Sequence, residues 1–182
     1  MRIITGKAKG RRLVAPDTRD TRPVTDRVRE AVFSMLGSGV VGASVLDLYA
    51  GSGSFGLEAL SRGATRAVFV ENAHRALEAL RKNITAVGLG GTVVTSTVHE
   101  FLARSSGSFD LVFIDPPWSV QSPALASDLV ALDPLLEPGA EVLMSRRHTD
   151  PLPETPKGWL VATDRRYGDT RIVRYGKETG DS

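Results

Sequence analysis

Several residue types and sequence features are missing or rare. Cysteine is absent from the 182 residues, which excludes disulfides and thiolate metal sites and makes a cytoplasmic location the expectation. The only histidines, His74, His99 and His148, are scattered without metal-ligand spacing, so we expect no metal site. No apolar run reaches the length of about 18 residues that a membrane-spanning helix needs. The first seven residues turn basic and lack the apolar stretch of a secretory signal.

The remaining composition is that of a folded protein. Hydrophobic residues make up 41% of the chain, which is enough for a substantial core and too much for a disordered chain. At this length the sequence suits one domain with a short appendage. We predict a basic extension at residues 1–22, the main domain at residues 23–176 and a flexible tail at residues 177–182.

Charge is spread unevenly along the chain. Residues 1–30 hold nine Lys/Arg and four Asp/Glu, whereas residues 31–144 hold six and eleven. A basic segment on an acidic body is typical of polyanion binding, because Lys and Arg displace counterions from phosphates, although such segments are also often simply solvated. We predict phosphate contacts, which position a nucleic acid without reading its sequence, for the basic side chains of the extension: Arg2, Lys7, Lys9, Arg11 and Arg12.

Strands and helices alternate along the main domain. Thr25 is typical of a helix start and Gly37 of its end. A later helix has leucines at positions 125, 129, 132 and 136 and is closed by Pro138-Gly139. Seven apolar strands are predicted, at residues 44–50, 66–71, 92–96, 109–115, 140–145, 159–164 and 171–175.

The connections between these strands predict the fold class. Strands joined by helical crossovers pair in parallel, with helices on both faces of the sheet. The last two strands leave room only for a turn at Gly168. We therefore expect a doubly wound, Rossmann-like α/β fold. Its seven-stranded sheet is mostly parallel with a C-terminal antiparallel hairpin, and residues 1–14 add a short β-hairpin or extended arm.

A glycine-rich turn follows the first strand. Gly51-Ser52-Gly53-Ser54-Phe55-Gly56 has the Gly-x-Gly-x-x-Gly pattern, and Glu71 ends the next strand 20 residues after Gly51. Glycines let a ligand approach bare backbone amides, and a carboxylate at that spacing suits ribose hydroxyls. The pair indicates an adenosine-type cofactor, against the alternative that the glycines only shape a tight turn.

Asp47 favours S-adenosylmethionine (SAM) over NAD. It lies four residues before Gly51, where a carboxylate would oppose a pyrophosphate and attract a cationic ligand. SAM carries an ammonium and a sulfonium and has no phosphate. The predicted cofactor contacts cover the strand end, the turn and the end of the second strand: Asp47, Tyr49, Ala50, Gly51, Ser52, Gly53, Glu71 and Asn72.

Asp115-Pro116-Pro117-Trp118 follows the fourth strand, at the edge where open α/β sheets bind ligands. An aromatic amine is a poor nucleophile because its lone pair is delocalised into the ring. A carboxylate and the Pro116 carbonyl can each accept one N–H and localise that lone pair, while Trp118 stacks on the base. We predict these four residues to be the reaction centre for methylation of a nucleobase amine. The alternative is a rigid Asp-Pro turn with a core tryptophan.

The whole pattern resembles the RsmD family of 16S ribosomal RNA guanine-N2 methyltransferases of the small subunit. The glycine and Asp-Pro-Pro-aromatic motifs are shared by many amino-methyltransferases, whereas the opening arm and the segment around residues 21–30 are far more specific. The matching stretches are Arg2-Ile3-Ile4-Thr5-Gly6-Lys7, Lys9-Gly10-Arg11-Arg12-Leu13, Thr21-Arg22-Pro23-Val24-Thr25-Asp26-Arg27-Val28-Arg29-Glu30, Leu46-Asp47-Leu48-Tyr49-Ala50-Gly51-Ser52-Gly53, Gly56-Leu57-Glu58-Ala59-Leu60-Ser61-Arg62-Gly63-Ala64 and Tyr167-Gly168-Asp169-Thr170.

The resemblance implies a class I SAM-dependent fold, SAM as cofactor and 16S rRNA in a small subunit or assembly intermediate as partner. It also implies that residues 22–27, including Thr25, lie near the methionine end of SAM. Two departures stand out: Trp118 replaces the usual Tyr, and Val98-His99 follows the third strand where many SAM enzymes have an acid near the adenine. Val98 and His99 are assigned to the adenine pocket on that basis, with a plain helix start as the alternative for His99.

Other functions remain open at this point. The same chemistry could act on adenine in DNA or on a protein glutamine amide, and the basic arm disfavours the protein. An NAD-dependent oxidoreductase or a catalytically inactive RNA-binding or ribosome-assembly protein would also carry some of these features. A monomer is expected.

Overall fold

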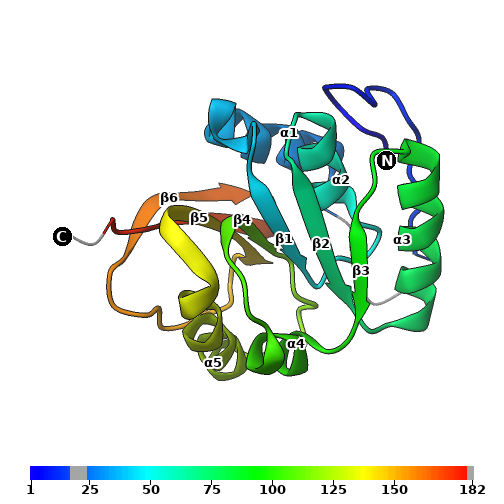
Figure 1. Cartoon of the computed structure of the whole chain (residues 1–182). Coiled ribbons are helices and arrows are strands. Elements are labelled where there is room, and N and C mark those ends of the chain that lie inside the picture. The colour runs from blue at the N-terminus through cyan, green and yellow to red at the C-terminus, as the bar shows by residue number, and fades with distance from the viewer. Residues whose placement is uncertain (17–23, 180–182) are drawn as a thin grey trace.

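The computed structural model describes residues 1–16 and 24–179, and the predicted boundary between residues 22 and 23 lies outside them. Five α-helices and seven strands alternate in the described part of the chain (Figure 1). The helices, with two 3-10 turns, are α1 Asp26–Leu36, η1 Gly37–Val40, α2 Ser54–Ser61, α3 His74–Val87, α4 Val98–Arg104, α5 Ser122–Leu132 and η2 Asp133–Leu135. The strands are β1 Ser44–Leu48, β2 Arg66–Glu71, β3 Thr92–Thr95, β4 Phe109–Ile114, β5 Leu136–Arg147, β6 Trp159–Tyr167 and β7 Thr170–Lys177.

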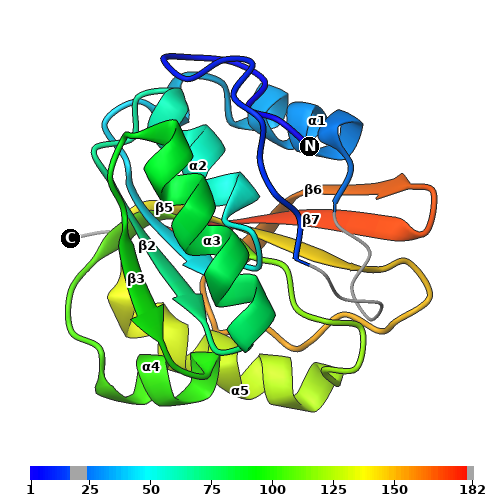
Figure 2. The ribbon, with the colours of Figure 1, turned by 90° about the vertical axis from the view of Figure 1, so that its right-hand side faces the viewer.

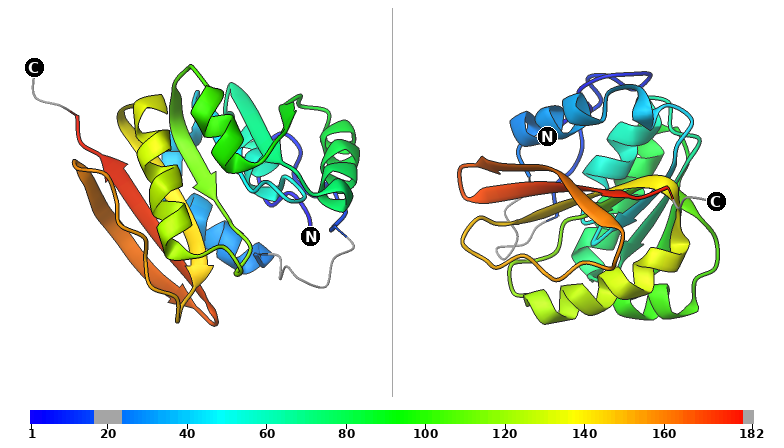
Figure 3. Two further views of the ribbon diagram at one scale, coloured as in Figure 1. Left: turned by 90° about the horizontal axis from the view of Figure 1, so that it is seen from below. Right: turned by 90° about the vertical axis from the view of Figure 1, so that its left-hand side faces the viewer.

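All seven strands form one sheet in the order β3-β2-β1-β4-β5-β7-β6. The first five pair in parallel, and β7 pairs antiparallel with both β5 and β6. Helical crossovers force the parallel pairing, whereas the turn at Gly168 permits only the antiparallel one. The predicted fold class is therefore confirmed, and the left view of Figure 3 shows the C-terminal hairpin closing one side of the sheet.

The sheet divides the core into two layers. One cluster of buried side chains lies under α1, α2 and α3, with Phe33, Leu57 and Leu80 among its members. The other lies under α4 and α5 and includes Leu102 and Leu129. Figure 2 shows the two sets of helices on opposite faces of the sheet. Because the central parallel strands are covered on both sides, their residues are mostly apolar and buried, as in the pattern of β4.

The N-terminal segment packs onto this domain. Ile3 and Leu13 are buried in the core, and the backbone amides of Ile4 and Thr5 donate to the Glu58 carboxylate at 2.7 and 3.0 Å. A single antiparallel bridge, Arg2 with Arg12, forms where we expected a hairpin or an extended arm. Backbone hydrogen bonds join the two sides of this segment, as from the Ile3 amide to the Arg11 carbonyl at 2.9 Å, and further bonds join it to α2 and α3.

Some predicted boundaries differ from the structure. Leu136 begins β5 and does not end the preceding helix, because α5 already ends at Leu132 and η2 follows. The helical spacing of the leucines continues from α5 into β5. The sequence pattern therefore gave no sign that the helix ends at Leu132. Strand β7 runs to Lys177, which the sequence assigned to the tail. Its ammonium donates to the Asp133 carbonyl at 2.7 Å.

No helix among the described residues combines the length and apolar character needed to cross a membrane.

Candidate active site at the carboxyl edge of the sheet

The turn after β1 has a backbone that few side chains allow. Gly53 has a φ of +78°, and a Cβ there would lie 2.4 Å from Leu80 Cδ1. Tyr49 also has a positive φ, 56°, and is the only described non-glycine residue that does. Its hydroxyl donates to Asp128 Oδ2 at 3.0 Å, which ties this conformation to α5. The turn therefore leaves backbone without side chains at the carboxyl edge, where an adenosine-type ligand can approach, while the Gly53 amide donates to the Ala50 carbonyl at 2.7 Å.

Acidic side chains gather beneath this turn. Asp47 is buried, and its Oδ2 accepts the Gly56 amide at 2.9 Å. Burial raises the pKa of Asp47 well above its usual range, and the negative charges of Asp115 and Glu71 raise it further. No cationic side chain contributes to that shift. The edge is therefore electrostatically suited to a cationic ligand such as SAM and unsuited to a pyrophosphate.

Glu71 holds the glycine turn from the neighbouring strand. One carboxylate oxygen accepts the Gly51 amide at 2.8 Å, and the other accepts the amides of Asn72 and Ala73 at 2.8 Å each. A carboxylate has about four acceptor positions, so one remains for a ribose hydroxyl. The contact between Glu71 and the ribose stays a prediction. The structure shows that Glu71 also shapes the glycine turn.

The remaining predicted cofactor residues differ in their exposure. Val98 is buried in the core, whereas the exposed His99 has Nδ1 3.5 Å from Asp128 Oδ1. Ala50 and Ser52 are buried within the turn. Sequence reasoning missed Asp128, because nothing in the pattern of α5 marks one buried acid among its leucines.

Thr25 is the N-cap of α1, where its side chain accepts the Val28 amide at 3.3 Å. This confirms the predicted helix start. A contact between Thr25 and SAM stays a prediction.

Asp115 follows β4 directly, and its amide donates to the Leu48 carbonyl at 3.4 Å. Ser145 of the adjacent strand β5 lies one residue beyond Met144, which pairs with Ile114 at the end of β4. Burial raises the pKa of Asp115 to about 6, and the Ser145 hydrogen bond opposes that rise. At neutral pH the group is therefore a partly desolvated carboxylate, which is a stronger hydrogen-bond acceptor than one in water.

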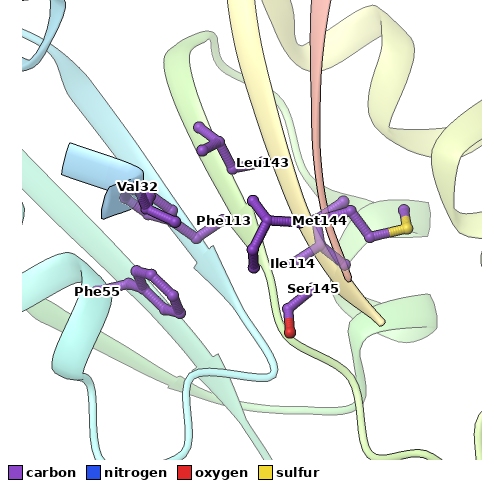
Figure 4. Close-up of a pocket in the computed structure, with 8 residues that line it drawn as sticks. Val32, Phe55, Phe113, Ile114, Leu143, Met144 and Ser145 are labelled. Carbon is purple, nitrogen blue, oxygen red and sulfur yellow. The ribbon is translucent and has the colours of Figure 1, made fainter. Parts of the chain in front are cut away.

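A layer of aromatic rings packs around Phe113, two residues before Asp115. The rings of Phe55 and Phe113 stack at 4.9 Å between centroids, and Phe33 lies 5.5 Å from Phe113. Figure 4 shows Val32, Phe55 and Phe113 gathered on one side of a small cavity, with the Ser145 hydroxyl directed away from them. The cavity has a volume of about 10 Å³, which is room for one water molecule at most. The carboxyl edge is therefore preformed and tightly packed.

The Asp-Pro-Pro-Trp loop follows β4 directly. Pro116 is buried, whereas Pro117 and Trp118 are half-buried. The Arg147 guanidinium lies 4.5 Å from the centroid of the Trp118 ring. Sequence reasoning missed both Ser145 and Arg147. The available signal was the polar run after the apolar part of the fifth strand, since ligands bind beyond the carboxyl ends of strands.

The basic side chains of the N-terminal arm lie at the opposite edge. The Lys7 amide donates to the carbonyl of Ser61, the last residue of α2, and Arg11 Nη1 donates to Ala86 in the last turn of α3. Both helices start at the carboxyl edge and return to the amino edge. Figure 1 accordingly shows the dark-blue arm at the top, with the arrowheads of β1 and β2 pointing away from it. Arg2, Lys9 and Arg12 are exposed on this arm, and the structure does not bring them to Asp115.

Within residues 1–16 and 24–179, no three His, Asp or Glu side chains gather in a way that could hold a metal ion.

Comparisons with known proteins agree with this geometry. Residues 1–176 match the model of the family described as Conserved hypothetical protein 95. The chain belongs to this family. It is 35% identical over 179 residues to ribosomal RNA small subunit methyltransferase D of Escherichia coli K12, covering 98% of this chain and 90% of that protein. It is 33% identical over 183 residues to the putative rRNA methyltransferase YlbH of Bacillus subtilis, covering 97% and 99%.

A solved structure extends the likeness to three dimensions. The putative methyltransferase yhhF from Escherichia coli superposes with a TM-score of 0.88 at 34% identity, covering 99% of each chain. Membership of the family confirms the resemblance drawn from the motifs. The chain is a SAM-dependent methyltransferase with the class I fold, and the acidic edge fits the charge of SAM.

Proposed function

We propose that the protein transfers a methyl group from SAM to the exocyclic N2 of a guanine in small-subunit 16S ribosomal RNA. The observation that carries this proposal is the position of the Asp115 carboxylate. It lies at the end of β4, beside the strand that leads into the glycine turn, and Trp118 follows it in the same loop. The names of the relatives from Escherichia coli and Bacillus subtilis support RNA of the ribosome as the substrate.

The residues of the loop would act mainly by positioning. SAM supplies an electrophilic methyl group when it is bound. Asp115 and the Pro116 carbonyl would each accept one hydrogen of the guanine amino group and so localise the nitrogen lone pair toward that methyl. Trp118 would stack on the base, as base-directed enzymes commonly do. No proton need leave the nitrogen before transfer, so Asp115 serves first as an acceptor of hydrogen bonds.

SAM itself would be held by the turn and the acids around it. The bare backbone of the glycine turn, the Glu71 carboxylate and the residues at the start of α4 would contact its ribose and adenine. Asp47 and Asp115 would favour its positive charge, because each has a pKa raised by burial that a nearby cation would lower again. Thr25 is proposed to lie near the methionine end.

The N-terminal arm is proposed to bind phosphates at a distance from the target nucleotide. Its exposed basic side chains lie at the amino edge of the sheet, whereas Asp115 lies at the carboxyl edge, so one RNA molecule would have to extend along the face that joins them. Such contacts orient a folded RNA without reading its sequence. A monomer acting in the cytoplasm on a small subunit or its assembly intermediate fits this arrangement.

The test is transfer of labelled methyl groups from SAM to purified small subunits, naked 16S rRNA, DNA and protein extract, followed by nucleoside mass spectrometry. We expect N2-methylguanosine in the small-subunit or rRNA fractions. Label in N6-methyladenosine of DNA or in glutamine would replace the proposed acceptor with another one. Absence of transfer to every acceptor, with SAM still bound, would favour an inactive RNA-binding protein.

A further inference from the structure

One face of the Trp118 indole is covered by a side chain from the central part of the sheet. The guanidinium carbon of Arg147 lies 4.5 Å from the ring centroid. Trp118 belongs to the loop after β4, whereas Arg147 is the last residue of β5. The contact therefore connects a loop that would receive the base to the end of a strand that is paired with β7.

The backbone of Arg147 is paired on one side. The pairing of β5 with β4 ends at Met144, whereas the pairing with β7 continues to Arg147, which lies opposite Thr170. Side chains two residues apart in a strand share one face of the sheet. Arg147 thus projects from the same face as Ser145, whose hydroxyl lowers the pKa of Asp115. The guanidinium therefore leaves the sheet on the same side as a residue that acts on the reaction centre.

Arg147 also lacks the partners that usually hold a buried arginine. Its Nε is buried without a hydrogen-bond partner, and no ion pair joins it to any acid in the described part of the chain. The neighbouring Arg146, in contrast, lies 3.3 Å from an oxygen of Asp150 and donates to the Val120 carbonyl at 3.0 Å. The indole face is therefore the principal contact that the Arg147 guanidinium makes.

We propose that Arg147 is a positioning residue for the target base, holding the plane of the Trp118 ring so that the other face of the indole receives the guanine. This inference rests on the proposed function. A cation over the face of tryptophan is attracted by the ring quadrupole. A ring already held in its plane binds a base without first losing its own rotational freedom. Arginine suits this role better than lysine, because its planar guanidinium stacks on the ring.

The experiment combines fluorescence with RNA kinetics. The chain has two tryptophans, and Trp159 is buried with its indole nitrogen bonded to Asp133. In a Trp159→Phe background, Trp118 is the only tryptophan, and excitation at a wavelength that tyrosine does not absorb reports on it alone. We expect Arg147→Ala to increase acrylamide quenching of Trp118 and to raise KM for the RNA about threefold, as the loss of a half-exposed cation–π contact predicts. The Kd for SAM should not change.

Two further variants make the test specific. Arg147→Lys keeps the charge and should recover only part of the RNA affinity, whereas loss of a simple phosphate contact would be largely rescued. Arg66→Ala is the matched control. Arg66 begins β2, at the opposite edge of the sheet, and its guanidinium lies 5.3 Å from the ring of Phe109 at the start of β4. Its removal should leave the quenching of Trp118 and the KM for RNA unchanged.

Each outcome decides the proposal. Unchanged quenching and KM in Arg147→Ala would overturn it, and so would a lower KM, because the guanidinium would then occupy the face that the base needs. Full recovery of RNA affinity in Arg147→Lys would also overturn it, because the positive charge alone, without stacking on Trp118, would then explain the effect. If the Trp159→Phe enzyme binds SAM but forms no N2-methylguanosine in any rRNA, the proposed function fails first and this inference with it. If the Trp159→Phe variant is unstable, the Trp118 signal is obtained by difference. The fluorescence of Trp118→Phe, which reports on Trp159 alone, is subtracted from that of the wild type at each acrylamide concentration.

Discussion

The buried carboxylates at the two edges of the sheet differ in whether they have charged partners. At the amino edge, Glu58 is fully buried, and its carboxylate accepts two backbone amides of the N-terminal segment and pairs with Arg62 at 2.8 Å. At the carboxyl edge, Asp47 and Asp115 share no ion pair in the described residues, and burial raises the pKa of both. A fully paired polar network stabilises a fold, whereas desolvated groups left without counter-charges cluster at functional sites. The comparison separates the anchor of the arm from the site of chemistry.

The largest expected effect is that of Asp115→Asn at the carboxyl edge. Methyl transfer should fall roughly 10²–10³-fold, the usual consequence of losing one charged group that binds the reacting atoms. The same change should stabilise the protein by about 1–3 kcal/mol at pH 7. The folded-state pKa of about 6 is raised above the usual value, so the native protein must hold an unfavourable charge once the pH exceeds 6.

Single-turnover assays and thermal unfolding at pH 5 and pH 7.5 check both halves of this prediction. The stability gain should shrink at pH 5, where Asp115 is largely protonated. SAM binding should persist, which serves as the control for folding. Near-normal turnover would remove Asp115 from the mechanism.

At the amino edge, Glu58→Gln should have the converse phenotype. The glutamine NH₂ group would face a backbone N–H that now donates to a carboxylate oxygen of Glu58, so one hydrogen bond would be lost. Arg29 and Arg62 would also lose a nearby negative charge. We expect a loss of about 2–3 kcal/mol in the free energy of unfolding. Denaturant titration measures it, and the turnover number well below the melting temperature should match that of the wild type. A specific loss of turnover without a loss of stability would break the comparison between the edges.

The exposed charges of the arm should affect RNA binding only. Replacing Lys7, Lys9 and Arg12 together by alanine removes three cations that make no ion pairs within the described residues. The slope of log K against log salt should fall by about two, since each phosphate contact contributes roughly 0.7 for a single strand. Filter binding at several salt concentrations measures the slope, with SAM affinity as the control. An unchanged slope would show that the arm is only solvated.

The smallest expected effect is that of Ser145→Ala. Its hydroxyl lowers the pKa of Asp115 against the effect of burial, so removing it should raise that pKa by about one unit. Because the ionised carboxylate is the active form, the acid limb of the rate profile should move to higher pH. Rates measured from pH 5 to pH 8 show the shift, and Ser145→Thr, which keeps the hydroxyl, should restore much of it. A uniform loss at every pH would indicate a packing defect instead.

Much of the site was predictable because its signals are local. Gly51 and Gly53 follow an apolar strand at a point where the backbone must turn. Asp115 directly follows another apolar strand, at the edge of the sheet where ligands bind. Ser145, Asp128 and Arg147 were not predictable, because each matters through a contact with a residue of another element: Asp115, Tyr49 and Trp118 respectively. No single-strand or single-helix pattern reports such a contact.

The N-terminal arm shows the same limit for the fold. Its basic residues could be read from the sequence, but its position could not, because it follows from hydrogen bonds to Glu58 and Ser61, more than 50 residues away. Thus the arm and the reaction centre, both assigned to RNA, lie at opposite edges of one sheet.

By itself, the amino-acid sequence determined the alternation of strands and helices, the glycine turn and the acid-proline-aromatic loop, since each depends on the conformational limits of neighbouring residues. Only the tertiary structure decided which charges lose their water and which find partners. Desolvation depends on the density of atoms brought in from the whole chain, so the raised pKa of Asp115 and the stacking of Arg147 on Trp118 exist only after the sheet has assembled.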